Sequence, residues 1–362
     1  MRIQAALVES VGGPFTLRDV DIDEPRPDEI LVRIRAAGIC HTDLGTREVW
    51  PRLPMVFGHE GAGVVEAVGS AVTTVAPGDT VCLSYRSCAT CDNCTSSRSA
   101  YCQAGIHTLN ATGTRPDHST PLSRDGSPVF GSFFGQSSFA THALAYESNC
   151  VKIPAGLDPV LAAPLGCGVQ TGAGTVLNVL QPAAGSSLVV FGAGSVGLSA
   201  VMAAVAEGSS VVAVDPVASR RAMAQDLGAV ATLDPEDLDD VATALHEITQ
   251  GGAHHAIDTT GRSAVISQAI VALRRRGTLA LVGIGKTAEF DIMTVMTKGI
   301  QLRGVIEGDA VPRTFIPHLI ALHEQGRLPV EKLITRYPFS DIEAAARAAA
   351  SGEVIKPVLT FS

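Results

Sequence analysis

The chain has 362 residues, of which 46% are hydrophobic and 17% are charged, and its formal net charge is −9. The hydrophobic content excludes an intrinsically disordered chain, and the acidic balance argues against a nucleic-acid-binding protein, which needs a basic face. Because domains typically have roughly 100–200 residues, the length predicts two domains, each with a core of its own.

The N-terminal part of the chain is predicted to be rich in β-strands. Short apolar runs, such as Ile30–Ile34 and Gly63–Val68, alternate with glycine and proline turn signals. The stretch from Tyr85 to Arg124 has little periodicity and many Ser, Thr, Cys and Asp residues. We therefore expect a long loop there, and a loop of this length needs something that holds it in place.

From Ala162 onward the sequence alternates between apolar strands and helices. The predicted strands are Ser187–Phe191, Ser210–Val214 and Thr278–Val282, and the predicted helices are Ser195–Ala206, Ala218–Leu227 and Ala264–Leu273. This alternation predicts a parallel sheet with helices on both faces, and so the α/β class. After Val305 the pattern predicts two helices and a final strand, over Pro312–Gln325, Ser340–Ser351 and Val358–Phe361.

Eight cysteines are the most informative part of the composition. The N-terminus shows no charged segment followed by an apolar run, so we expect no secretory signal and a cytoplasmic protein. In a reducing compartment, clustered cysteines bind metals more often than they form disulfides. Cys82 and Cys150 lie in apolar, strand-like stretches, and we interpret them as buried hydrophobic residues.

Four cysteines form the pattern Cys88-x2-Cys91-x2-Cys94-x7-Cys102. Four thiolates on one short loop match tetrahedral zinc, and a closed all-cysteine shell leaves no position for a substrate, so this zinc would be structural. Such a metal would also order the long loop. An iron–sulfur cluster is the alternative, but no proline follows the last cysteine, and the spacing to that cysteine is long.

A second, open metal site is suggested by Cys40, His59 and Cys167, each in a glycine-flanked segment. Two thiolates and one imidazole leave the fourth position of a zinc ion free for substrate, as in the known alcohol dehydrogenase arrangement. Asp43 or Glu60 is expected to orient the imidazole or to lie next to the metal ligands without binding the metal directly.

The stretch Gly192-Ala193-Gly194-Ser195-Val196-Gly197 follows an apolar strand and opens an apolar helix. That context is the one in which G-x-G-x-x-G binds a dinucleotide pyrophosphate. The next strand ends in Asp215, close to the spacing of a carboxylate that binds the ribose 2′-hydroxyl, which favours NAD over NADP. Arg220 and Arg221 follow closely, and either could reach a 2′-phosphate, so NADP is the alternative cofactor. The uncharged stretch Leu188–Ala206 is long enough for a membrane span, but its glycines favour a strand, a turn and a helix.

The motif Gly58-His59-Glu60-x-x-Gly63-x5-Gly69, followed by the four-cysteine loop and the glycine-rich turn, resembles the zinc-dependent medium-chain alcohol dehydrogenases over essentially the whole chain. Within that family, the stretches Phe134–Ala140 and Gly166–Gly174 are similar to bacterial benzyl- or aryl-alcohol dehydrogenases, and geraniol-type enzymes look similar too. The resemblance implies a GroES-like β-rich catalytic domain, 1–168 and 307–362, that a doubly wound Rossmann domain, 169–306, interrupts.

The resemblance also implies roles for individual residues. Cys40, His59 and Cys167 would bind the catalytic zinc, with Glu60 close behind it, and Thr42 would take the proton of the alcohol. The implied cofactor contacts are His41, Thr171, Gly192, Gly194, Ser195, Val196, Gly197, Asp215, Arg220, Val282, Ile284 and Lys356. Many relatives carry a histidine where this chain has Gly45, so water, the cofactor ribose or His41 would complete the proton path beyond Thr42.

The expected function is therefore the reversible oxidation of a primary aromatic or allylic alcohol to its aldehyde, with NAD and two zinc ions per chain. Trp50, Phe133, Phe134 and Ile284 are expected either to line an apolar substrate pocket or to be ordinary core residues. A glutathione-dependent formaldehyde dehydrogenase and a non-catalytic NAD-binding scaffold are the alternatives. A homodimer or homotetramer is expected, with no nucleic-acid or membrane partner.

Overall fold

The computed structural model describes the backbone of residues 1–362 and all side chains except those of Ile106 and His107. The chain divides into two compact units. The first unit comprises Met1–Cys167, Val311–Ile320 and Glu331–Ser362, and the second comprises Gly168–Ala310 and Ala321–Val330. The chain therefore leaves the first unit and returns to it, as the family resemblance implies.

The first unit is built on two sheets. The smaller sheet has the order β4-β1-β2-β7-β8, with bounds Met55–Val56, Arg2–Val8, Thr16–Ile22, Leu122–Arg124 and Ser127–Val129. The larger sheet has the order β10-β6-β5-β3-β18-β17, with β9 also paired to β3; the bounds are Cys150–Lys152, Thr80–Leu83, Glu60–Val68, Glu29–Gly38, Lys356–Thr360, Ile334–Pro338 and, for β9, His142–Tyr146. An aliphatic and aromatic core, which includes Leu7, Ile30 and Phe139, fills this unit.

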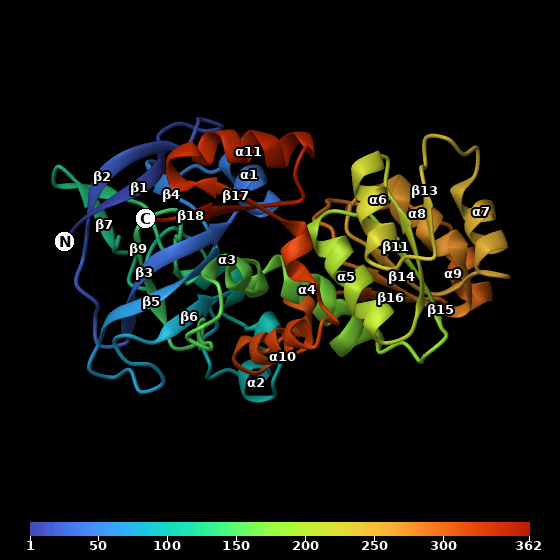
Figure 1. The fold of residues 1–362 in the computed structure, drawn as a ribbon, viewed down its shortest axis with the longest axis horizontal. Helices are drawn as coiled ribbons and strands as arrows, with labels where there is room; N and C mark the ends of the chain where they lie inside the picture. Colours follow the sequence, from blue (N-terminus) through green and yellow to red (C-terminus); the bar gives the residue numbers. More distant parts are fainter. The chain divides into compact units, whose positions relative to one another are not determined.

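The C-terminal strand completes the larger sheet. β18 runs antiparallel to β3, with Val358 opposite Gly38, and parallel to β17. In Figure 1 the red end of the chain accordingly lies beside the blue N-terminal strands. This pairing carries Lys356, at the start of β18, next to the segment that follows β3 and leads to Cys40.

Short helices connect the strands of the first unit. They are α1 (His41–Arg47), α2 (Asp92–Thr95), η1 (Ser99–Tyr101), η2 (Gly105–Asn110), η3 (Phe133–Gly135), α3 (Pro159–Ala162), η4 (Ala163–Gly166), η7 (Val330–Leu333), η8 (Phe339–Asp341) and α11 (Ile342–Ser351). The predicted loop over Tyr85–Arg124 contains three of these helical turns. The prediction is wrong at the end of that loop, where β7 is a strand too short to give a periodic signal.

The second unit is a parallel sheet in the order β13-β12-β11-β14-β15-β16, and every neighbouring pair is parallel. The bounds are Ala231–Leu233, Ser210–Val214, Ser187–Phe191, Ala253–Asp258, Leu273–Leu281 and Gln301–Gly304. In sequence order this is 3-2-1-4-5-6, the doubly wound arrangement that binds dinucleotides where the strand order reverses. The predicted Rossmann fold class is thereby confirmed.

Helices flank this sheet (Figure 1). The helical segments of this unit are α4 (Gly168–Gly174), η5 (Thr175–Leu180), α5 (Ser195–Ala206), α6 (Ala218–Asp226), α7 (Val241–Ile248), α8 (Ser263–Ala272), α9 (Ile292–Lys298) and η6 (Glu307–Asp309). The next helix, α10 (Pro312–Glu324), is divided, because its residues up to Ile320 belong to the first unit and those from Ala321 belong to the second. The predicted bounds of β11, β12 and α5 are confirmed, so the uncharged stretch Leu188–Ala206 is a strand, a turn and a helix. β15 begins at Leu273, earlier than predicted, because the exposed run Arg274–Arg276 hides its apolar pattern.

Among the described residues, no single helix has the length and apolar character needed to cross a membrane. One bent pair of helices, Pro159–Gly166 and Gly168–Leu180, would meet those two criteria together.

Candidate active site

Four side chains that can bind a metal meet within the first unit. One donor atom from each of Cys40, His59, Glu60 and Cys167 lies within 4.8 Å of the others. Cys40 immediately precedes α1, His59 and Glu60 lie where β5 begins, and Cys167 follows η4. All but the half-buried Cys40 are buried. The fold thus brings together residues from three distant parts of the chain that the sequence predicted as one site.

Asp43 fixes the two segments that carry Cys40 and His59. Its Oδ1 lies 2.9 Å from His59 Nδ1 and accepts the Gly58 N–H at 3.0 Å, and its Oδ2 accepts the Cys40 N–H at 3.1 Å. Asp43 is the third residue of α1 and is fully buried. When Nδ1–H donates to the Asp43 carboxylate, the neutral imidazole presents a lone pair at Nε2.

His59 Nε2 gives the clearest sign of a metal. This atom is buried and has no hydrogen-bond partner in the described part of the chain. Buried polar atoms without partners are rare and need an explanation. Two thiols and a carboxyl group around an imidazole lone pair are a donor set that suits zinc, so the residues present fit the metal that the resemblance of the motifs implies.

The electrostatics around Cys40 favour the thiolate that metal binding requires. A hydrogen bond with Cys167 lowers the pKa of the Cys40 thiol, and burial opposes this effect. His59 and Lys356 also favour the charged sulfur, so that the pKa of Cys40 lies well below its ordinary value.

Lys356 and Glu60 form a buried ion pair directly behind the donor atoms. Lys356 Nζ donates to both carboxylate oxygens of Glu60, at 2.8 and 2.9 Å, and to the Ile39 carbonyl at 3.2 Å. Burial lowers the pKa of Lys356, but the negative Glu60 and Cys40 raise it above the ordinary lysine value. The predicted contact of Lys356 with the cofactor pyrophosphate stays a prediction, and its observed partner is Glu60.

Aromatic rings surround His59. The Phe134 ring stacks on the imidazole, with a centroid distance of 4.5 Å and an interplanar angle of 26°, and the Phe133 ring meets it edge-on at 5.7 Å. Trp50 packs edge-on against Phe133 at 6.1 Å, and its buried indole Nε1 has no partner in the described residues. Phe134 has a φ of 53°, a left-handed conformation that costs roughly 1–2 kcal/mol. Three of the four predicted pocket residues therefore lie together, whereas Ile284 belongs to the second unit.

Thr42, the predicted proton acceptor, is half-buried, and its Oγ1 lies 3.7 Å from Cys40 Sγ. Gly45 is on the same helix and is exposed. A Cβ added to Gly45 would meet no atom within 4 Å. The position where many relatives carry a histidine is thus open space beside α1.

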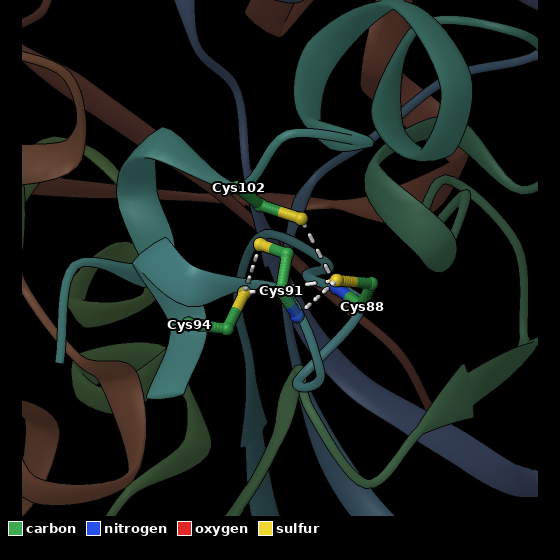
Figure 2. Close-up of side chains that lie close together, drawn as sticks. All are labelled: Cys88, Cys91, Cys94 and Cys102. Carbon is green, nitrogen blue, oxygen red and sulfur yellow. Dashed lines mark hydrogen bonds between the residues drawn. The ribbon is translucent and has the colours of Figure 1, made fainter. Parts of the chain in front are cut away.

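The four cysteines Cys88, Cys91, Cys94 and Cys102 form a separate cluster that could hold a metal (Figure 2). Their sulfur atoms point toward one another and lie within 4.8 Å of each other; Cys88 Sγ is 3.9 Å and Cys91 Sγ is 3.5 Å from Cys94 Sγ. Sulfur ligands at about 2.3 Å from a tetrahedral zinc are separated by about 3.8 Å, so these distances fit zinc. Backbone and side-chain hydrogen bonds from Thr90 lower the pKa of Cys88 to about 6, which favours the thiolate at neutral pH.

In the second unit, the three glycines of the predicted dinucleotide turn differ in their surroundings. Gly192 has a φ of 90° and faces Thr259, a Cβ on Gly197 would overlap the Gly192 carbonyl oxygen, and a Cβ on Gly194 would meet nothing within 4 Å. A tight turn, close helix–strand packing and an open approach for the pyrophosphate are the three glycine roles in this motif. Ser195 Oγ, at the start of α5, is buried without a partner in the described residues.

Asp215 lies directly beside this turn. Its Oδ2 accepts the Ala193 N–H at 2.7 Å, and its Oδ1 accepts the Val217 N–H at 2.8 Å. Arg220 Nη1 is 3.8 Å from Asp215 Oδ2, and Arg221 donates to the Asp215 carbonyl at 2.8 Å. Both arginine side chains therefore contact Asp215.

The other predicted cofactor residues are divided between the units. Thr171, on α4, has its hydroxyl 3.4 Å from Glu307 Oε2. Val282 follows β15, and Ile284 is 82% exposed. These three belong to the second unit, whereas the exposed His41 opens α1 in the first.

Sequence reasoning missed Gln136, a buried amide that hydrogen-bonds to the backbone around His59. It also missed the Glu60–Lys356 pair. Neither contact has a local sequence signal, because the partners meet only in the folded sheet. The bond from Asp43 to the Cys40 N–H does have one, since a carboxylate three residues after a helix N-cap often accepts the N-cap N–H.

Comparisons with known proteins identify the family. Residues 26–155 match the alcohol dehydrogenase GroES-like domain, and residues 195–324 match the zinc-binding dehydrogenase family. The chain is 45% identical to a geraniol dehydrogenase of Castellaniella defragrans, over 99% of this chain and 97% of the relative. It is also 33% identical to an NDMA-dependent alcohol dehydrogenase of Amycolatopsis methanolica, over 100% of each chain.

Two crystal structures have the same fold. A benzyl alcohol dehydrogenase from Acinetobacter calcoaceticus superposes with a TM-score of 0.96 at 40% identity, with 100% of each chain covered. An alcohol dehydrogenase zinc-binding domain protein from Burkholderia ambifaria superposes with a TM-score of 0.97 at 46% identity, covering 100% of this chain and 99% of the other. The chain therefore belongs to the zinc-type medium-chain alcohol dehydrogenase family, as the sequence motifs predict, and is an oxidoreductase that acts on alcohols.

Proposed function

We propose that the enzyme oxidises primary aromatic or allylic alcohols reversibly to their aldehydes, with hydride transfer to NAD. The observation that carries the proposal is the unpartnered His59 Nε2, on an imidazole that lies close to two thiols, stacks on the Phe134 ring and meets the Phe133 ring edge-on. The similarity to a geraniol dehydrogenase and a benzyl alcohol dehydrogenase supports a flat, apolar substrate. Aromatic walls favour such a substrate because they bury its π-face.

We assign two zinc ions to each chain. The catalytic ion would bind at the open site, to Cys40, His59 and Cys167, with Glu60 next to these ligands. The structural ion would bind at the closed four-cysteine site, to Cys88, Cys91, Cys94 and Cys102. A zinc ion at the open position supplies Lewis-acid chemistry that lowers the pKa of an alcohol hydroxyl. Asp43 keeps the imidazole in its tautomer, and Lys356 balances the negative charge of Glu60.

In this proposal the Thr42 hydroxyl accepts the proton that the alcohol loses, since it lies on the Cys40 side of the site. Gly45 has no side chain to carry that proton farther, so water, the cofactor ribose or His41 takes it on. The aromatic rings around His59 exclude bulk water from the reacting carbon and orient the alcohol.

NAD is the proposed cofactor. The turn Gly192–Gly197 and the unpartnered Ser195 hydroxyl offer a pyrophosphate site. The Asp215 carboxylate would accept the ribose 2′-hydroxyl and repel a 2′-phosphate. His41, Thr171, Arg220, Val282, Ile284 and Lys356 are retained as the further proposed contacts, on the strength of the family resemblance.

We also propose the domain bounds 1–168, 169–306 and 307–362. The first compact unit ends at Cys167 and the second begins at Gly168, which supports the first of these boundaries to within a few residues. A cytoplasmic homodimer or homotetramer is proposed as well. The edge strand β16 is exposed along its whole length, and an unpaired strand edge is a surface that suits pairing with a second copy.

Two measurements test the function. NADH formation should be fastest with benzyl, cinnamyl or allylic terpene alcohols and slower with short aliphatic alcohols. Hydroxymethyl-glutathione as the best substrate would instead favour a glutathione-dependent formaldehyde dehydrogenase. Metal analysis should find two zinc ions per chain. A single zinc together with NAD binding but no turnover would favour a scaffold.

A further inference from the structure

We propose that Gln136 is a positioning residue for the catalytic zinc ligands. Its side-chain amide joins the backbone of His59 to that of Ser84, and Ser84 in turn holds Gly166, the neighbour of Cys167. One amide thus links the segments of two proposed ligands that lie far apart in sequence. The inference rests on the proposed zinc site and goes beyond it.

Both N–H donors of the Gln136 amide are used, and its carbonyl oxygen accepts one hydrogen bond. Nε2 donates to the His59 and Ser84 carbonyl oxygens, each at 2.9 Å, and Oε1 accepts the Gly61 N–H at 3.0 Å. The reverse orientation would place Oε1 against two carbonyl oxygens, so the network fixes the amide. Gln136 is 2% exposed, and its bonds bracket His59 and the residues that follow it.

Ser84 extends the link to the third ligand. Its hydroxyl donates to the Gly166 carbonyl at 2.6 Å, one residue before Cys167. A Cβ at Gly166 would overlap the Leu83 carbonyl oxygen, so the two backbones lie in direct contact. The distance between the His59 and Cys167 segments therefore depends on the contacts of Leu83 and Ser84 with Gly166 and on the hydrogen bonds of Gln136.

The same segment leads to the closed cysteine cluster. Ser84 is four residues before Cys88, and the Tyr85 hydroxyl lies 2.7 Å from Ser99 Oγ inside the cysteine loop. Asn149 Nδ2 donates to the Ser84 carbonyl at 3.3 Å and to the Phe134 carbonyl at 3.1 Å. The segment at Ser84, directly after β6, is thus connected to the cysteine loop through Tyr85, to Phe134 through Asn149 and to His59 through Gln136.

The consequence is that Gln136 contributes to zinc retention at the open site without touching the metal. Removing hydrogen bonds behind a metal ligand typically weakens metal binding about 10–100-fold. Gln136→Met keeps the length of the side chain and removes every one of these hydrogen bonds, so it isolates the polar link from the packing.

The experiment measures zinc release from the purified full-length enzyme to a chromophoric chelator. The wild type should release its two zinc ions in two phases, and Cys167→Ala should lack the phase of the open site, which assigns it. Gln136→Met should release that zinc about 10–100-fold faster and leave the other phase unchanged. Ser84→Ala, which loses the hydroxyl that donates to Gly166, should show a smaller change in the same phase.

Asn110→Ala is the matched control. Asn110 is also a buried amide of the first unit, and its side chain makes two hydrogen bonds to the backbone of Arg86, at 2.8 and 2.9 Å, rather than to a backbone group beside His59. It should lower stability without accelerating release from the open site. Unchanged release in both Gln136→Met and Ser84→Ala, or equal acceleration in Asn110→Ala, overturns the inference. A wild type that holds one zinc overturns the proposed function instead.

Discussion

Lys356 Nζ lies 2.8 and 2.9 Å from the two carboxylate oxygens of Glu60, and both side chains are almost completely buried. Breaking such a pair leaves one charge without its partner in the interior, which costs about 3–5 kcal/mol. We expect Lys356→Met to lower the free energy of unfolding by that amount. Urea denaturation of the zinc-loaded enzyme measures it.

The double variant Glu60→Gln, Lys356→Met should recover most of this loss, because no buried charge is then left alone. The surface pair Lys152–Asp79, whose lysine is 60% exposed and whose carboxylate is half-buried, provides the control. Exposed ion pairs contribute only about 0–1 kcal/mol, so Lys152→Met should change the unfolding free energy little. A double variant that is no better than the single one would mean that packing, and not charge, explains the loss.

The four-cysteine cluster is expected to act on stability. Cys94→Ala should remove one zinc per chain and lower the unfolding temperature. A loss of about 3 kcal/mol corresponds to roughly 6–12 °C for a unit of this size. Cys150→Ala, at a buried cysteine outside both clusters, should retain both zinc ions. Calorimetry with metal analysis checks both variants, and an unchanged melting temperature in Cys94→Ala would contradict a structural metal.

Asp215 is expected to select NAD. Asp215→Asn keeps the size of the side chain and an acceptor for one of its two backbone N–H partners, but removes the negative charge. A hydrogen bond to a charged group contributes about 1.5–3 kcal/mol. We therefore expect kcat/KM for NAD to fall by about 10-fold to 100-fold, and the NAD/NADP ratio to fall with it. An unaltered ratio would remove Asp215 from this role.

A buried ion network predicts a loss of stability in acid. Burial raises the pKa of Glu29, but the two hydrogen bonds from Arg115, at 2.6 and 3.0 Å, and the charge of Arg115 act with hydrogen bonds from the Arg26 N–H and the Tyr146 hydroxyl to bring the net pKa below the ordinary 4.5. A lowered folded-state pKa stabilises the protein above the unfolded value, and this contribution is lost as the pH falls through the folded value. The stability of the wild type should thus decrease below about pH 4.5.

Glu29→Gln is the variant that isolates this effect. It should unfold more easily than the wild type at pH 7, because the buried Arg115 loses its buried charged partner and keeps only the exposed Asp23. The difference between the two proteins should narrow as the pH falls below the ordinary carboxyl range. Urea denaturation over a pH series follows this difference, and a constant gap would contradict the assignment.

Much of the site is predictable from sequence where coordination chemistry or a turn restricts the spacing. The cysteines from Cys88 to Cys102 lie on one loop, and the glycines from Gly192 to Gly197 serve one turn, so each pattern is local. Cys167 was a candidate from its glycine-flanked segment, and the family resemblance supported it, but no local spacing links it to Cys40 and His59.

Other contacts have no local signal. Gln136 reaches Ser84 and His59 only because β5 and β6 are neighbours in the sheet. Buried amides look like surface amides in a sequence, since their partners are backbone groups that any residue could supply. The first residues of β15 were not predicted as a strand, because the side chains directly after Leu273 are charged and exposed. Three arginines at an exposed strand look like a loop, although backbone pairing with β14 extends back to Leu273.

Gly45 provides a test of the proton path. Its exposed position on α1 has room for a side chain, and replacing a helical glycine stabilises a protein by roughly 0.4–1 kcal/mol. Gly45→Ala and Gly45→His should both show this gain in urea denaturation. Only Gly45→His adds a base near Thr42, with an ordinary pKa of about 6.5. When proton transfer limits the rate, kcat of Gly45→His should exceed that of Gly45→Ala above this pH and converge with it below. Identical pH profiles would show that the proton leaves Thr42 by another route, through the cofactor ribose or His41.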